Sequence, residues 1–324
     1  MNRTVMSAAL LMGMAAAIPA AERPPSLVYV TNERGGTVTV IDPRTDTVVR
    51  TIDVGSRPRG VRIRSGKLYV ALTNLNTKRE NARAAIAEVD LGAGDRVRIL
   101  ASGTDPEQLA LSADGRKIYV SNEDASALSI VDVASGRVVK ALPVGDEPEG
   151  VAVTPDGRWC WVTSESGNVV SILDTAKEEI VARVVPDSRP RGLAFTPDGR
   201  MAYVSCELGG SICVFDAVSH EKKGCTKLVP GERPVGLAVT PDGGTVFAGT
   251  GRGNTVVVLD AAGALLGRIP VGERPWGIAL TEDGTKLYAG NGLSNTVSVI
   301  DVATRRVLAT IPGGDGPWGV AIGR

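Results

Sequence analysis

The sequence predicts an all-β fold in which seven four-stranded units form a closed ring, and three observations lead to this expectation. Residues inside each unit alternate between apolar and small or polar, which is the period of a strand and not of a helix. The two ends of the chain carry complementary parts of one further unit. An Asp that ends a β-branched run recurs at intervals of 41 to 48 residues, at Asp42, Asp90, Asp132, Asp174, Asp216, Asp260 and Asp301. Together these features predict a seven-bladed β-propeller with four antiparallel strands in each blade.

Composition and charge are those of a folded globular chain. The 324 residues include 36 basic and 36 acidic side chains, one His, 39 Gly and 19 Pro. The many Gly and Pro residues suit a fold with frequent turns. A balanced charge gives no reason to expect nucleic acid or an anionic membrane as a partner.

The N-terminal stretch differs from the rest of the chain. Residues 1–21 contain a short cationic start, an apolar run and the small residues Pro19, Ala20 and Ala21. This pattern is typical of a secretory signal peptide, although a retained N-terminal helix is the alternative. We therefore expect a signal peptide at 1–21, a propeller at 22–324, and a periplasmic or secreted protein without a membrane span.

One unit shows the expected strands in order. Gly150 to Thr154 alternates, and Pro155-Asp156-Gly157 follows as a hairpin turn in which Gly supplies a positive φ. The further strands are expected at Trp159 to Thr163, Val169 to Leu173 and Ile180 to Val185. Each run is short and bounded by turn residues, as strands are.

The ends of the chain predict how the ring closes. Leu27 to Asn32 reads as a second strand with no Pro-x-Gly segment before it, whereas Pro317 to Ile322 carries that segment at the end of the sequence. We expect this C-terminal strand to join the N-terminal blade as its innermost strand. An open solenoid is the alternative, but it would need capping repeats.

The residues that vary between units indicate a site at one end of the ring. The Asp-Gly turns, the second-strand aromatics and the Asp after the third strand recur, so we interpret them as turn and packing residues. The position after the Pro of Pro-x-Gly varies instead, and its loop shares one end of the ring with the loop between strands two and three. We expect an Arg-rich arc, an acidic arc and two adjacent Trp residues there. The candidate ligand-binding or partner-binding residues are Arg59, Glu107, Glu149, Arg191, Arg233, Arg274, Trp276 and Trp318. The alternative is a set of solvated charges with the Trp side chains packed on their neighbours.

Two further features stay open at this point. The second unit carries eight extra residues in Thr73 to Ala85, which suits either a lid or docking element or a tolerated insertion. Cys206, Cys213 and Cys225 lie close together in the predicted strands. A disulfide among them and buried free thiols are both compatible with this spacing.

No familiar catalytic pattern stands out in the sequence. The single His, His220, lies in a polar stretch at the opposite end of the predicted ring, where solvation is expected. There is no G-x-S-x-G elbow, no phosphate-binding loop and no C-x-x-C-H segment. We therefore predict no catalytic residue, no metal ligand and no cofactor, while a divalent cation on axial carboxylates stays possible.

Several segments resemble known propeller repeats. Tyr29-Val30-Thr31-Asn32 and Tyr119-Val120-Ser121-Asn122 resemble the YVTN family of β-propeller repeats. Glu147-Pro148-Glu149-Gly150, Arg189-Pro190-Arg191 and Gly316-Pro317-Trp318-Gly319 are similar to exported propellers associated with catabolism that depends on pyrroloquinoline quinone. This second resemblance implies a protein that accompanies quinoprotein alcohol oxidation.

Three functions follow as expectations. The leading one is a monomeric accessory propeller that binds a periplasmic quinoprotein dehydrogenase or its small-molecule ligand at the axial face. The alternative is a lactonase or lyase that uses axial carboxylates such as Glu107, Glu149 and Glu165 with a divalent metal. Binding of single-stranded nucleic acid is a third possibility, which the neutral charge disfavours.

Overall fold

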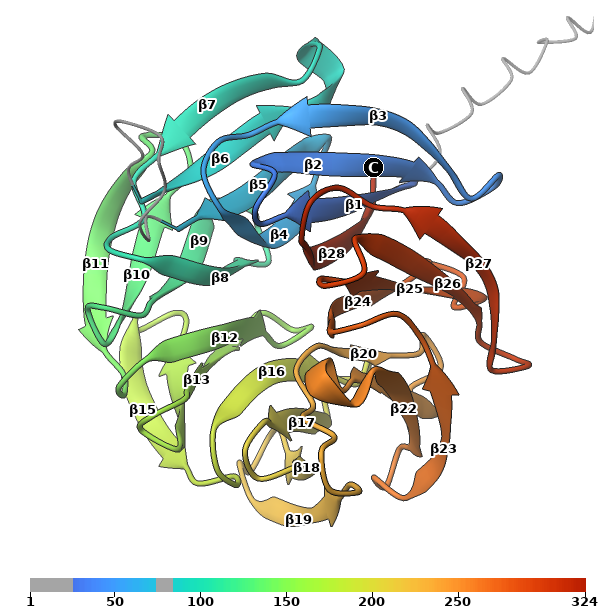
Figure 1. Cartoon of the computed structure of the whole chain (residues 1–324). Helices are drawn as coiled ribbons and strands as arrows, with labels where there is room; N and C mark the ends of the chain where they lie inside the picture. Colours follow the sequence, from blue (N-terminus) through green and yellow to red (C-terminus); the bar gives the residue numbers. More distant parts are fainter. Residues whose placement is uncertain (1–25, 74–83) are drawn as a thin grey trace, which may run out of the picture.

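Seven antiparallel four-stranded sheets surround one axis in the computed structural model of the chain (Figure 1). The structure describes residues 26–73 and 84–324. The predicted signal peptide and most of the enlarged loop in the second unit lie outside these residues. Within them, the only helical elements are two short 3-10 turns, η1 (Leu91–Ala93) and η2 (Gly251–Gly253). The prediction of an all-β seven-bladed propeller is confirmed.

No helix in the described part of the chain has the length and apolar character needed to cross a membrane.

In every blade the innermost strand lies next to the axis, and the second strand pairs with it on the outer side. The innermost strands are β4 (Pro58–Arg64), β8 (Pro106–Leu111), β12 (Pro148–Val153), β16 (Pro190–Phe195), β20 (Leu237–Val239), β24 (Pro275–Leu280) and β28 (Pro317–Gly323). The second strands are β1 (Leu27–Asn32), β5 (Lys67–Leu72), β9 (Lys117–Asn122), β13 (Trp159–Ser164), β17 (Met201–Cys206), β21 (Thr245–Gly249) and β25 (Lys286–Asn291).

The outer half of each blade completes the sheet. The third strands are β2 (Thr37–Asp42), β6 (Ala85–Asp90), β10 (Ala127–Asp132), β14 (Val169–Asp174), β18 (Ser211–Asp216), β22 (Thr255–Asp260) and β26 (Thr296–Asp301). The outermost strands are β3 (Thr47–Asp53), β7 (Arg96–Leu100), β11 (Arg137–Pro143), β15 (Glu179–Val184), β19 (Lys222–Lys227), β23 (Leu265–Pro270) and β27 (Arg306–Pro312).

The core lies between neighbouring blades and not inside any one of them. One cluster joins Val40 of β2 to Val61 and Val70 of the next blade. Another places Trp161 of β13 against Val204 and Phe215 of the following blade, with all three side chains buried. Each sheet therefore needs its neighbours to bury both faces, which is the physical reason for the ring.

The Gly of each Pro-x-Gly segment allows the innermost strands to approach closely. A Cβ on Gly150 would lie 2.0 Å from the carbonyl oxygen of Arg191 in the next blade. A Cβ on Gly192 would lie at the same distance, 2.0 Å, from the carbonyl oxygen of Val235. No other residue fits such a gap, so these Gly residues fix the spacing of the strands around the axis.

Hydroxyl groups of the second strands join one blade to the next. The Oγ1 of Thr163 accepts from the Gly150 amide at 2.7 Å and donates to the Arg191 carbonyl at 2.7 Å. Ser205 makes the same pair of bonds, to the Gly192 amide and to the Val235 carbonyl. In four of the seven blades, the carbonyl of the residue after the Pro is thus held by a second-strand hydroxyl of the preceding blade, from Thr31, Ser121, Thr163 or Ser205.

The ring closes as the sequence predicts. Strand β28 pairs antiparallel with β1, with Val28 opposite Ile322 and Val30 opposite Val320. The resulting sheet has the order β28-β1-β2-β3, and the first and last strands lie side by side in Figure 1. The Gly319 amide also donates to Thr31 Oγ1 at 2.8 Å.

The Asp after the third strand has the structural role that its recurrence predicts. Its carboxylate accepts a backbone amide two to four residues further on in every blade, as Asp132 does from Ser135 at 2.8 Å. This bond closes the turn into the outermost strand. A recurring Asp in this fold is therefore a turn residue.

The structure answers two questions that the sequence raised, on a disulfide among the cysteines and on the environment of His220. Cys213 and Cys225 form a disulfide between β18 and β19, while Cys206 and Cys160 are buried free thiols. His220 is half-buried, and its ring packs edge-on against Trp159 with 5.1 Å between ring centroids. The expectation of a solvated His220 was therefore wrong, because the tryptophans of β13 cover it.

Candidate functional site

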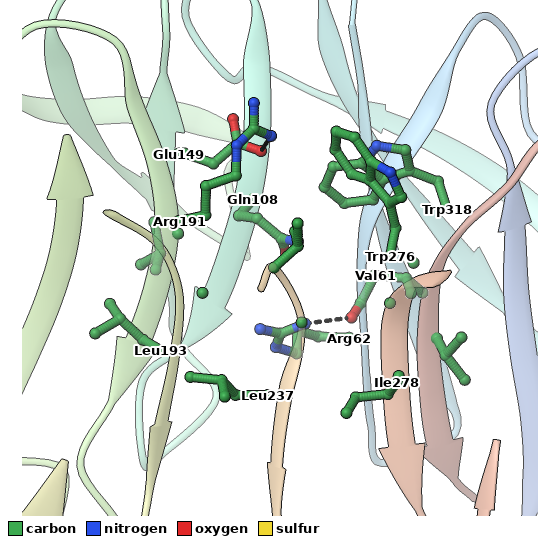
Figure 2. Close-up of a pocket in the computed structure, with 18 residues that line it drawn as sticks. Val61, Arg62, Gln108, Glu149, Arg191, Leu193, Leu237, Trp276, Ile278 and Trp318 are labelled. Atoms are coloured by element: carbon green, nitrogen blue, oxygen red, sulfur yellow. Dashed lines mark hydrogen bonds and ion pairs between the residues drawn. The ribbon is translucent and has the colours of Figure 1, made fainter. Parts of the chain in front are cut away.

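A cavity on the axis collects residues from all seven innermost strands. It has a volume of about 90 Å³, and its polar lining comes from Glu149, Arg191, Gln108 and Arg62. Figure 2 shows Glu149 and Arg191 on one side of this cavity and the Trp276 and Trp318 rings on the other. Four of the eight predicted site residues, Glu149, Arg191, Trp276 and Trp318, thus face one space.

Arg191 contacts three carboxylates, one from strand β12 and two from the loops that follow β13 and β17. Its Nη1 donates to Glu149 Oε1 at 2.9 Å, its Nη2 lies 2.5 Å from Glu165 Oε1, and its Nε lies 2.9 Å from Glu207 Oε2. Arg189 adds a second guanidinium, with its Nε 2.6 Å from Glu165 Oε2. Two cations and three anions share this network, so it holds one negative charge in excess when every group is ionised.

Arg59 forms a second network beside the first. Its Nε donates to Glu33 Oε1 at 3.0 Å, and its Nη1 pairs with Glu107 Oε1. Arg57 donates to the same Glu33 oxygen at 2.6 Å. Two guanidiniums balance two carboxylates here.

Separate basic and acidic arcs were the wrong expectation for this face. Glu107 is fully buried, and Arg191 is only 9% exposed. Because Arg191 and Glu149 start neighbouring innermost strands, the fold pairs opposite charges. Burial makes such pairing necessary, since an unpaired charge away from water is costly.

Trp276 and Trp318 lie against each other on one side of the cavity, and a guanidinium group packs on each ring. The rings of Trp276 and Trp318 have centroids 5.5 Å apart, and Trp318 is only 6% exposed. The guanidinium carbon of Arg191 lies 4.9 Å from the Trp276 ring, and that of Arg59 lies 5.6 Å from the Trp318 ring. The expected pair of adjacent Trp residues is present, with one ring buried and not exposed.

Burial changes the protonation of the carboxyl groups at this site. Burial and the nearby charge of Glu149 raise the pKa of Glu165 to about 7, although two guanidiniums oppose this shift. Burial is also the main reason that the pKa of Glu107 and that of Glu123 lie above the usual range. Groups that titrate near neutrality are suited to proton transfer.

The remaining predicted residues lie at the edge of the site. Arg274 stacks on Trp276, with its guanidinium carbon 4.5 Å from the ring. Arg233 is half-buried and forms no ion pair with any residue in 26–73 or 84–324. Arg233 therefore does not join the networks of the cavity.

Sequence reasoning missed Arg62 and Gln108, which both line the cavity. Arg62 stands in β4 where every other innermost strand has Ala, and Gln108 replaces the Gly of Pro-x-Gly. A comparison of the seven units at these two positions would have found both residues. Such a comparison is informative because departures from a repeat mark residues that the fold itself does not need.

The carboxylates proposed as metal ligands are engaged by arginine. Glu149 and Glu165 bind Arg191, and Glu107 binds Arg59. One group of acidic oxygens, from Asp105, Glu107 and Glu123, lies within 4.8 Å of one another. Since one oxygen of Glu107 is already paired with Arg59, this group alone does not establish a cation site.

Comparison with known proteins finds one matching family model. The model of the family described as lactonase, 7-bladed beta-propeller, matches residues 173–310. No curated protein sequence matches the chain.

Several solved structures share the fold over most of the chain. A periplasmic gluconolactonase of Pseudomonas aeruginosa is 20% identical, with a TM-score of 0.78 over 92% of this chain and 99% of its own. A putative 6-phosphogluconolactonase of Bacteroides fragilis is 16% identical, with a TM-score of 0.76 over 94% and 100%. Hydrazine synthase of Kuenenia stuttgartiensis is 22% identical, with a TM-score of 0.74 over 85% and 92%.

These findings correct the leading functional expectation. An accessory protein of quinoprotein alcohol oxidation was the wrong interpretation, because the matching family model is that of lactonases and two of these solved structures carry gluconolactonase names. At 16 to 22% identity the solved structures show the fold alone. The chain is a seven-bladed β-propeller of the architecture that these proteins share.

Proposed function

We propose that the protein is a lactonase-type enzyme that hydrolyses a lactone in the axial cavity. The observation that carries the proposal is the pair formed by Glu149 and Arg191, which faces the cavity opposite Trp276 (Figure 2). The lactonase family model and the two gluconolactonase structures support the choice of reaction. The first substrate to test is therefore gluconolactone.

Hydrolysis needs a base, a stabiliser of negative charge and a place for the ring. Glu149 accepts a proton from water while the water oxygen bonds to the carbonyl carbon of the lactone. Arg191 stabilises the negative charge that develops on the carbonyl oxygen. The bond from the carbonyl carbon to the ring oxygen then breaks, and that oxygen takes the proton back from Glu149. The product is a hydroxy acid.

Glu165 serves as a positioning residue in this mechanism. It does not line the cavity, but its Oε1 lies 2.5 Å from Nη2 of Arg191. Glu207 and Arg189 complete the support. With three carboxylate contacts the guanidinium of Arg191 has little freedom to turn, which suits a preorganised site.

The test is hydrolysis of gluconolactone by the purified protein and its variants. Glu149→Gln keeps the size of the side chain but removes the base, so kcat should fall by about 10²-fold or more. Glu147→Gln is the matched control, since Glu147 lies two residues earlier and bonds Ser166 at the surface. Equal activity of Glu149→Gln and Glu147→Gln would contradict the proposal.

We also propose a periplasmic or secreted location for the mature domain, residues 22–324. The proposal rests on the signal-like composition of residues 1–21 and agrees with the periplasmic solved relative. Mass spectrometry of the protein isolated from the periplasm should find an N-terminus near residue 22. A full-length chain retained in the cytosol would overturn it.

A further inference from the structure

Arg62 breaks the repeat at the centre of the ring. It is the fifth residue of the segment that starts at Pro58, and the other six units have Ala there. The six equivalent residues are Ala110, Ala152, Ala194, Ala238, Ala279 and Ala321. The propeller therefore does not need an arginine at this position for its packing.

The guanidinium of Arg62 lies in the axial cavity and has no acidic partner among the described residues. Figure 2 shows it between Gln108 and the apolar side chains of Leu237 and Ile278. Its one hydrogen bond to the residues of 26–73 and 84–324 runs from Nη1 to the Val61 carbonyl at 2.8 Å. This environment is unlike that of Arg59 and Arg191, which carboxylates surround.

A half-buried guanidinium with no acidic partner in the described ranges costs stability. Burial alone lowers the pKa of Arg62, but an arginine side chain remains charged in proteins at neutral pH. A half-buried cation of this kind is stabilised by an anion that enters the cavity. Gln108 lines the same cavity, its Oε1 has no hydrogen-bond partner in the described part of the chain, and its amide nitrogen adds a donor.

We propose that Arg62 forms a carboxylate-binding site inside the axial cavity, which holds the acid group of the hydroxy acid product. The inference rests on the proposed function. Ring opening converts the neutral lactone into a carboxylate, and this carboxylate supplies the anionic partner for the Arg62 guanidinium. A charged product then binds more tightly than the neutral lactone. The expected consequence is competitive inhibition by the product.

Calorimetric titration with sodium gluconate tests this site without turnover. Arg62→Ala installs the residue that the other six units have, and it should raise the dissociation constant at least about tenfold, the effect of one lost charged contact. Arg64→Ala is the matched control on the same strand, where Arg64 reaches the Ala113 carbonyl at the surface. That variant should bind gluconate as the wild type does.

Thermal unfolding supplies a second readout that a purely structural role would not give. Without gluconate, Arg62→Ala should melt at a higher temperature than the wild type, because a half-buried charge with no acidic partner in residues 26–73 and 84–324 is removed. A lower melting temperature together with unchanged gluconate binding would overturn the proposal. If gluconate fails to bind while gluconolactone is hydrolysed, this inference fails and the proposed function stands. If gluconate binds through Arg62 but no lactone is hydrolysed, the proposed function fails alone.

Discussion

Individual charged residues of the axial site take their properties from their neighbours. Arg59 and Arg191 are held by carboxylates, whereas Arg62 has none among the described residues. Glu165 contacts two guanidiniums, yet its pKa rises because it is buried near Glu149. Chemical role at this scale depends on burial and charge balance more than on residue type.

The raised pKa of Glu165 predicts a pH dependence of stability. An acid that binds its proton more tightly in the folded state stabilises the fold at low pH, and this stabilisation is lost as the pH rises from about 4.5 to about 7. The free energy of unfolding of the wild type, relative to Glu165→Gln, should therefore fall by about 2 kcal/mol between pH 5 and pH 7. Urea denaturation at both pH values measures this. A difference that stays constant with pH would show that Glu165 does not hold the proton.

The position of several candidate site residues at the axis could be predicted from the sequence, but the pairing of their charges could not. The varying position after each Pro correctly marked Glu149, Arg191, Trp276 and Trp318 as neighbours of the axis. Arg191 meets Glu149, 42 residues earlier, only because adjacent blades bring their innermost strands together. Spacing along one chain does not show which charges meet across blades, and so the arcs were predicted as separate.

At the scale of single elements, the second strands connect the blades through their hydroxyl groups. Thr31, Ser121, Thr163 and Ser205 each bond a carbonyl of the next innermost strand. The residues whose carbonyls are held include Arg191, so the same contact positions a site side chain. The sequence showed a Thr or Ser in these strands, but not that its hydroxyl crosses to the next blade.

Thr163 provides the test of this connection. Thr163→Val keeps the shape but leaves the Gly150 amide and the Arg191 carbonyl without their partner, which should cost about 1–3 kcal/mol in the free energy of unfolding. Thr163→Ser retains the hydroxyl and should be close to the wild type. Chemical denaturation of the three proteins gives the comparison, and equal stability of the Val and Ser variants would refute the role.

At the scale of the whole molecule, closure of the ring depends on strands from opposite ends of the chain. Strand β28 completes the blade that holds β1, β2 and β3. The sequence predicted this closure because the two partial units are complementary. It could do so because the Pro-x-Gly segment and the strand after it recur in a fixed order in the other units.

Removal of residues 317–324 should therefore destabilise the protein by several kcal/mol, since the strand and the buried Trp318 side chain are lost together. Thermal melting compares the truncated and full-length chains. A synthetic peptide of residues 317–324 should restore part of the lost stability, whereas a scrambled peptide should not. Equal melting temperatures of the truncated and full-length chains would argue against closure by β28.

The pairing of β28 with β1 also sets an order of events during synthesis. Strand β1 leaves the ribosome early, but its inner edge has no partner until nearly all of the chain has been made. An unpaired strand edge can pair with another chain, including the β28 of a second copy. Folding thus ends at the blade that was made first, and exchanged dimers would form where many chains complete their fold close together.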